Sequence, residues 1–145
     1  MSIEPVEVLV VEDDLGDIKL IKESLKMSKL KIIINYCLDG QECMDYLRKV
    51  GPYKEVKKPD VIMLDLNMPK KDGRQVLAEM KIDPLFKKIP VVILTTSDDE
   101  IDIDETYELG ANCFVTKPVD FDQIKKIVNE IAGFWFVVAK LPDGK

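Results

Sequence analysis

Short apolar runs rich in β-branched residues alternate with amphipathic stretches along almost the whole chain, and this alternation restricts the possible folds most strongly. A run that is apolar at successive positions suits a strand buried on both faces, as in a parallel sheet. Amphipathic stretches between such strands are typical of crossover helices that cover both faces. The predicted strands are Val6–Val11, Lys31–Tyr36, Val61–Leu64, Val91–Leu94 and Cys113–Val115.

The stretches between these strands carry apolar side chains at helical spacing, as Ile18, Ile21 and Leu25 do. The order of elements is therefore (βα)₅. We predict a doubly wound, flavodoxin-like three-layer α/β sandwich whose five-stranded parallel sheet has the order 2-1-3-4-5. Acids that precede Glu or Gln by three residues predict helix starts with capping boxes at Asp39, Asp72 and Asp120.

Composition places the chain among single-domain globular proteins and removes several functional classes. Its 145 residues predict one domain, and its net charge of -6 argues against direct binding of nucleic acid. No apolar run is long enough to span a membrane, and the first residues do not resemble a signal peptide. With three cysteines in no CxxC pair, we expect reduced thiols and a cytoplasmic location. The absence of histidine excludes Ser-His-Asp triads and His-ligated zinc.

Chemically active side chains follow four of the predicted strands. Sites in open parallel sheets form beyond the carboxyl ends of the strands, where this chain has Glu12, Asp13, Asp65, Thr95 and Lys117. In the order 2-1-3-4-5 the two aspartates stand about 4.8 Å apart, one strand spacing. Carboxylates that close repel unless a cation bridges them, and oxygen ligands favour Mg²⁺. A carboxylate nucleophile beside a metal, a lysine and a hydroxyl suits phosphoryl transfer.

Four motifs resemble the receiver domain of two-component response regulators, and the resemblance covers nearly the whole chain. They are VLVVEDD at the first strand, VIMLDLNMPKKDG at the third, ILTTS at the fourth and VTKP at the fifth. The resemblance implies that Asp65 binds the metal and is phosphorylated. It further implies that Asp13 binds Mg²⁺ directly, Glu12 through water, and Asn67 through its main-chain carbonyl.

The resemblance also implies roles for residues around the phosphorylated carboxylate. Lys117 would pair with it, and the Lys117–Pro118 peptide bond is expected to be cis. Thr95 would move toward the phosphoryl group while Phe114, at a position that is often tyrosine, turns inward. An alternative is that Phe114 is simply a core residue. Two positions that tune the lifetime of the phosphoryl group across the family fall on Asn67 and Ser97.

The apolar C-terminal extension, at about residues 133–145, is unusual for such a domain. It resembles the tail of phytochrome-associated regulators, in which the tail takes part in dimerisation. Either a helical or an extended tail is compatible with the sequence, and so is a tail that folds back onto its own domain. We expect a homodimer whose interface includes Phe134, Trp135, Phe136 and Val137.

Residues 1–145 are thus expected to form a single receiver domain that signals by binding an unknown downstream protein. The phosphoryl donor would be a sensor histidine kinase or a histidine phosphotransfer protein. We expect no enzymatic activity beyond the domain's own phosphorylation and dephosphorylation. The alternatives are a pseudo-receiver that only binds partners and a metal-dependent phosphatase with an Asp nucleophile. Asn67 argues against the phosphatase, since an amide cannot replace the second acid as a proton donor.

Overall fold

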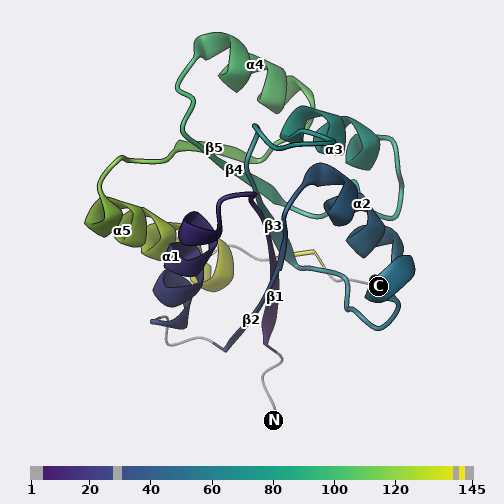
Figure 1. The fold of residues 1–145 in the computed structure, drawn as a ribbon, viewed down its shortest axis with the longest axis horizontal. Helices are drawn as coiled ribbons and strands as arrows, with labels where there is room; N and C mark the ends of the chain where they lie inside the picture. Colours follow the sequence, from purple (N-terminus) through teal and green to yellow (C-terminus); the bar gives the residue numbers. More distant parts are fainter. Residues whose placement is uncertain (1–4, 28–30, 139–140, 143–145) are drawn as a thin grey trace.

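Five parallel strands form one sheet in the order β2-β1-β3-β4-β5, which confirms the predicted topology (Figure 1). The computed structural model describes residues 5–27, 31–138 and 141–142. β1 and β3 have the predicted bounds, β4 and β5 end one residue later than predicted, and β2 begins and ends one residue later. The strands are β1 (Val6–Val11), β2 (Ile32–Cys37), β3 (Val61–Leu64), β4 (Val91–Thr95) and β5 (Cys113–Thr116).

Helices cover both faces of the sheet. In Figure 1, α1 and α5 lie side by side on one face, α2 and α3 cover the other, and α4 follows α3. None of the helices in the described part of the chain is long and apolar enough to cross a membrane. The helices are α1 (Leu15–Lys26), α2 (Gly40–Arg48), the short 3₁₀ helix η1 (Gly51–Tyr53), α3 (Gly73–Lys81), α4 (Glu100–Glu108), α5 (Phe121–Ala132) and the π-helix η2 (Gly133–Val138).

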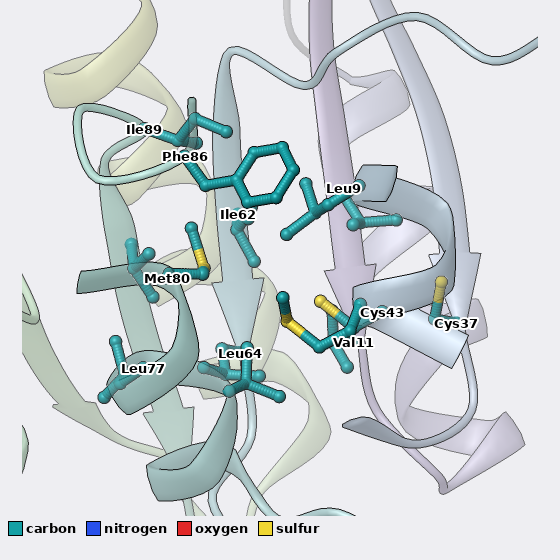
Figure 2. Close-up of a cluster of buried hydrophobic side chains, with 14 of the residues drawn as sticks. Leu9, Val11, Cys37, Cys43, Ile62, Leu64, Leu77, Met80, Phe86 and Ile89 are labelled. Carbon is teal, nitrogen blue, oxygen red and sulfur yellow. The ribbon is translucent and has the colours of Figure 1, made fainter. Parts of the chain in front are cut away.

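Strand side chains alternate between two apolar cores because successive residues of a strand point to opposite faces. On β1, Leu9 and Val11 pack into the core under α2 and α3, part of which Figure 2 shows. Val8 and Val10 pack into the core under α1 and α5. Both faces of the sheet are therefore buried, as the continuous apolar runs predict.

Side chains and main-chain groups cap the helices, although the predicted capping boxes form only in part. Asp72 caps α3 in a complete box. Asp39 caps α2, but the Glu three residues later accepts from the main-chain N–H of Leu38 instead of that of Asp39. At α5 the Asp120 side chain accepts from the main-chain N–H of Asp122 rather than from that of Gln123. The two incomplete boxes correct the prediction. At α5 the short Asp120 carboxylate satisfies a donor two residues ahead, and at α2 the longer Glu42 side chain reaches one residue beyond the cap.

The C-terminal segment continues α5 as a π-helix rather than leaving the helix at Gly133. A π-helix has i→i+5 hydrogen bonds, so residues five apart share a face. Phe136 follows Ile131 by five positions, and both side chains are buried in the core under α1 and α5. This winding decides the question that the sequence left open between a helical and an extended tail. Residues 139–140 and 143–145 of the tail lie outside the described residues.

Candidate functional site

The ends of β1 and β3 bring three carboxylates together. Val11 pairs with Leu64 in the sheet, and the next residue of each chain segment is an acid. Carboxylate oxygens of Glu12, Asp13 and Asp65 all lie within 4.8 Å of one another. Glu12 and Asp65 are buried, whereas Asp13 is exposed, so the cluster opens to solvent on one side.

Lys117 extends from the end of β5 into this cluster and is only 7% exposed. Its Nζ donates a hydrogen bond to Glu12 and another, of 2.9 Å, to Asp17 Oδ2. Asp65 Oδ2 lies 3.9 Å from the same Nζ. The long lysine side chain therefore crosses the distance from β5 to the acids, as expected from the strand order.

Burial and neighbouring charges together set the pKa values of Glu12 and Lys117. Burial raises the pKa of Glu12 to about 7. The hydrogen bond from Lys117 lowers this pKa, and the charge of Asp65 raises it. For Lys117, burial alone would lower the pKa, but the hydrogen bond to Glu12 and the charges of Asp65 and Glu12 raise it above its usual value. Lys117 is accordingly a fixed positive charge among the acids.

Thr95 ends β4 next to Lys117, whose main-chain N–H donates to the Thr95 carbonyl at 2.6 Å. The Thr95 side chain is fully buried, and its hydroxyl has no hydrogen-bond partner among the described residues. A buried hydroxyl without a partner is costly and rare. It leaves a donor available for an acceptor that enters the site.

The donor set fits a hard divalent cation. All the converging ligands are carboxylate oxygens, which is the chemistry that Mg²⁺ and similar ions prefer. The thiols of Cys37 and Cys43 are buried in the core under α2 and α3, so no soft ligand joins the cluster from there. The cluster holds a nucleophilic carboxylate and a lysine, with Thr95 at the end of the adjacent strand β4, and it can stabilise negative charge on transferred oxygens.

Three further predicted residues lie on or shortly after β3, β4 and β5. Asn67 is exposed in the loop after β3. The Ser97 hydroxyl donates to Asp102 Oδ2 at 2.6 Å, so it faces α4. Phe114 is half-buried against the core under α2 and α3.

The predicted cis bond between Lys117 and Pro118 is wrong, because the described residues contain no cis peptide bond. The trans form of a bond before proline is favoured by about 0.5–1 kcal/mol. With this trans bond, the Lys117 side chain already reaches Glu12 and Asp17.

The aromatic residues of the tail have different environments. Phe134 is 54% exposed, and Trp135 packs edge-on against it with ring centroids 5.4 Å apart. Phe136 is buried in its own domain, which removes it from the predicted interface because its ring is already covered. The side chain of Val137 lies outside the described residues.

Sequence reasoning missed two residues that shape the site. Asp17, in the first turn of α1, binds Lys117, and an acid one helical turn after the Asp13–Asp14 pair was the available signal. A Cβ at Gly73 would lie 2.5 Å from the Asp65 carbonyl oxygen. The sequence marked Gly73 only as the residue after a helix cap, with no sign of this close approach.

Comparison with known proteins gives a consistent result. The model of the response regulator receiver domain family matches residues 8–129. Response regulator Rcp1 of Synechocystis sp. is 44% identical over 138 residues, which are 95% of this chain and 94% of Rcp1.

Solved structures agree with this match over nearly the whole chain. The phosphorylated cyanobacterial phytochrome response regulator RcpA has 46% identity and a TM-score of 0.93, over 97% of this chain and 100% of RcpA. The Mn²⁺-bound form of Rcp1 has 43% identity and a TM-score of 0.92, over 96% of this chain and 100% of the Rcp1 chain.

Proposed function

The chain belongs to the response regulator receiver family, and on that premise we propose that Asp65 accepts a phosphoryl group in a Mg²⁺-dependent reaction. The observation that carries the proposal is the convergence of Glu12, Asp13, Asp65 and Lys117 at one edge of the sheet. The similar structures of phosphorylated RcpA and Mn²⁺-bound Rcp1 support it.

In the proposed reaction a carboxylate oxygen of Asp65 attacks the phosphorus of a phosphohistidine on another protein. The new P–O bond forms as the P–N bond breaks, and the imidazole leaves with the electron pair. Lys117 then has a stronger partner than its present contacts, because a phosphorylated Asp65 carries more negative charge at the position that now lies 3.9 Å away.

Glu12, Asp13 and Asp65 are the residues that would hold the metal, with the carbonyl of Asn67 as a further ligand implied by the family. Bound Mg²⁺ would neutralise charge on the transferred oxygens. The hydroxyl of Thr95 would donate to a phosphoryl oxygen, which satisfies a group that is buried without a partner.

Three further residues are proposed to adjust this reaction. Phe114 would turn further inward when Thr95 moves toward the phosphoryl group. Asn67 and Ser97 would set how long the phosphoryl group persists. Ser97 supports such a role because its hydroxyl is tied to Asp102 at the start of α4, so its orientation depends on that helix.

The donor is proposed to be a sensor histidine kinase or a histidine phosphotransfer protein, and the output is binding to a downstream protein that is not yet identified. No catalysis is proposed beyond the domain's own phosphorylation and dephosphorylation. Residues 1–145 would act as one receiver domain with an apolar extension at about 133–145.

Phosphorylation by acetyl phosphate tests the proposal. The protein is incubated with acetyl phosphate and MgCl₂, and intact mass spectrometry measures the addition of one phosphoryl group. Asp65→Asn should abolish the adduct, whereas Asp104→Asn, at an exposed acid of α4, should keep it. No adduct on the wild type would favour a pseudo-receiver. Turnover of small phosphate esters would favour the phosphatase.

We also propose a homodimer through the C-terminal region, with Phe134 and Trp135 at its interface. Phe134 supports this because its ring is 54% exposed beside Trp135, although Phe136 next to it is buried. Analytical ultracentrifugation should show a dimer that Phe134→Ser dissociates. Phe121→Ser is the matched control, since Phe121 is 66% exposed at the other end of α5. A wild type that stays monomeric, or a dimer unchanged by Phe134→Ser, contradicts the interface.

A further inference from the structure

A cavity of about 570 Å³ lies at the opposite edge of the sheet from Asp65. It is lined by the end of α2 and by the loops that lead into β3 and β4, with Pro142 of the tail at one wall. Its volume lies within the range of about 300–1,000 Å³ that is usual for small-molecule sites. The proposed phosphorylation chemistry does not use this cavity.

The floor of the cavity is apolar and rigid. Leu47, Phe86 and Ile89 line it, and their side chains are 7%, 6% and 6% exposed. All three belong to the core under α2 and α3, and Figure 2 shows Phe86 and Ile89 within it. Because well-packed core residues hold these side chains, the floor is formed before any ligand arrives.

Lysines surround the apolar floor. Arg48, the last residue of α2, also lines the cavity but pairs with Glu79 at 3.1 Å. Lys49 follows α2, Lys58 precedes β3 and Lys88 precedes β4, so three separate segments contribute one lysine each. None of the three forms an ion pair with another described residue. A basic rim is unexpected on a chain of net charge -6.

The two acids that line the cavity keep their negative charge, but each has a carboxylate oxygen held by a main-chain N–H group, and neither pairs with Lys58 or Lys88. Asp60 Oδ2 accepts from the main-chain N–H of Glu7 at 2.8 Å, and Asp83 Oδ1 accepts from that of Leu85 at 2.9 Å. Lys49 follows α2 directly, where a positive charge interacts favourably with the helix dipole. Lys58 and Lys88 lie in loops, so a helix dipole does not account for them. Their charges remain available to an anion.

We propose that this cavity binds a small carboxylate with a compact aromatic or branched apolar body. The apolar body would lie on Leu47, Phe86 and Ile89, and the carboxylate would interact with Lys58 and Lys88. Charge complementarity selects the anion, and a cavity of about 570 Å³ suits a compact apolar body. This site is independent of the acids around Asp65.

A pair of probes that differ in charge tests the proposal. Binding of 2-naphthoate and of its neutral analogue 2-naphthamide is followed by amide chemical shifts of the ¹⁵N-labelled full chain. We expect 2-naphthoate to shift the resonances of Lys58, Asp60 and Lys88, and to bind about fivefold or more tightly than the amide. The resonances of Asp13 and Asp65 should stay in place.

Variants separate the rim from general charge effects. The double variant Lys58→Gln/Lys88→Gln should weaken 2-naphthoate to the level of the amide, whereas Lys125→Gln/Lys126→Gln on α5 should leave its affinity unchanged. Thermal unfolding checks that both variants fold. The proposal is overturned by equal binding of the two probes, by shifts confined to another surface, or by no binding. Binding of an acidic peptide at these lysines without binding of 2-naphthoate would also overturn it.

Discussion

Lys117 is the residue at which the charges of the site meet. Its Nζ donates to both Glu12 and Asp17, and Asp65 lies slightly beyond hydrogen-bond distance. Three acids around one buried cation hold its side chain in the site before any phosphoryl group arrives. The pre-positioned charge reduces the reorganisation that phosphoryl transfer to Asp65 requires.

Thr95→Val tests whether the unpartnered hydroxyl is kept at a cost to stability. Valine has nearly the same shape and no hydroxyl, so we expect the unphosphorylated protein to gain about 1 kcal/mol in free energy of unfolding. The conformational response to acetyl phosphate should be lost. Urea denaturation measures the first effect, and amide chemical shifts the second.

Thr106→Val is the matched control. Thr106 is also fully buried, but its hydroxyl donates to the carbonyls of Asp102 and Ile103 at 2.9 Å. This substitution should lower the stability, since it removes a satisfied hydrogen bond. If Thr95→Val lowers the stability equally, the Thr95 hydroxyl does have a partner.

Glu7 on β1 predicts a pH dependence of stability. Burial raises the pKa of Glu7 above its ordinary value of 4.5. The charge of Lys57 lowers this pKa, and the charge of Asp60 raises it. The folded state therefore binds a proton more readily than the unfolded state, and the contribution of Glu7 to stability is lost as pH rises above about 4.5.

Glu7→Gln should remove this pH-dependent loss. Relative to wild type, its free energy of unfolding should increase as pH rises from about 4.5. Urea denaturation over a pH series measures the difference, with exposed Glu55→Gln as the control. A difference that is constant with pH would contradict the raised pKa.

At the scale of elements, the start of α3 packs closely against the main chain of Asp65 and Leu66. The complete capping box at Asp72 fixes the first turn of the helix. The main-chain N–H of Gly73 donates to the Leu66 carbonyl at 2.9 Å, which closes the loop after β3. Arg74 then pairs with Asp102 and Glu105 of α4, so α3 also anchors the neighbouring helix.

Gly73→Ala should destabilise the protein and disturb the site. The new Cβ would lie 2.5 Å from the Asp65 carbonyl oxygen and 2.9 Å from Leu66 Cα, and backbone atoms must move to make room. We expect the free energy of unfolding, measured by thermal unfolding, to decrease by about 2 kcal/mol. Binding of Mg²⁺ should also weaken.

Gly133→Ala is the contrasting variant at the same level. A Cβ at Gly133 meets nothing within 4 Å, and the residue is helical with φ of -60°. Alanine should stabilise the helix by about 0.5–1 kcal/mol. Equal effects of the two substitutions would show that the space around Gly73 is not limiting.

At the scale of the whole molecule, the carboxylate cluster gathers negative charge at one edge of the sheet, which metal binding should relieve. Ligands that bind only the folded state raise its stability, by about 2.7 kcal/mol at a concentration 100 times the Kd. We therefore expect MgCl₂ to raise the Tm in a saturable manner.

Asp13→Asn should reduce this rise in Tm, because Asp13 is one of the three converging carboxylates. The adjacent Asp14→Asn is the control. Asp14 caps α1, a role that asparagine also fills, and it is not part of the cluster. An equal response of both variants to MgCl₂ would indicate general screening of charge.

Much of the fold could be predicted because its signals are local. The bounds of β1 and β3 follow from apolar runs that end at acids. The ends of β2, β4 and β5 differ by a residue, since pairing with the neighbouring strand decides where a ladder stops: Thr95 pairs with Thr116, and Val11 with Cys37.

The tail and the details of the site could not be predicted in the same way. An α-helical wheel places Phe136 away from Ile131, and only the π-helical winding brings both onto one face. The trans bond at Pro118 and the close approach of Gly73 to Asp65 likewise depend on spatial neighbours that cannot be identified from a local sequence pattern.

The sequence by itself determined which side chains follow the strands, because the apolar runs and the residues directly after them are close together in the chain. Only the tertiary structure decided that Lys117 binds Glu12 and Asp17, which precede it by 105 and 100 positions. It likewise decided that lysines before β3 and β4 share one cavity. Contacts over such separations depend on how packed elements fix distances and directions, and a linear pattern contains neither.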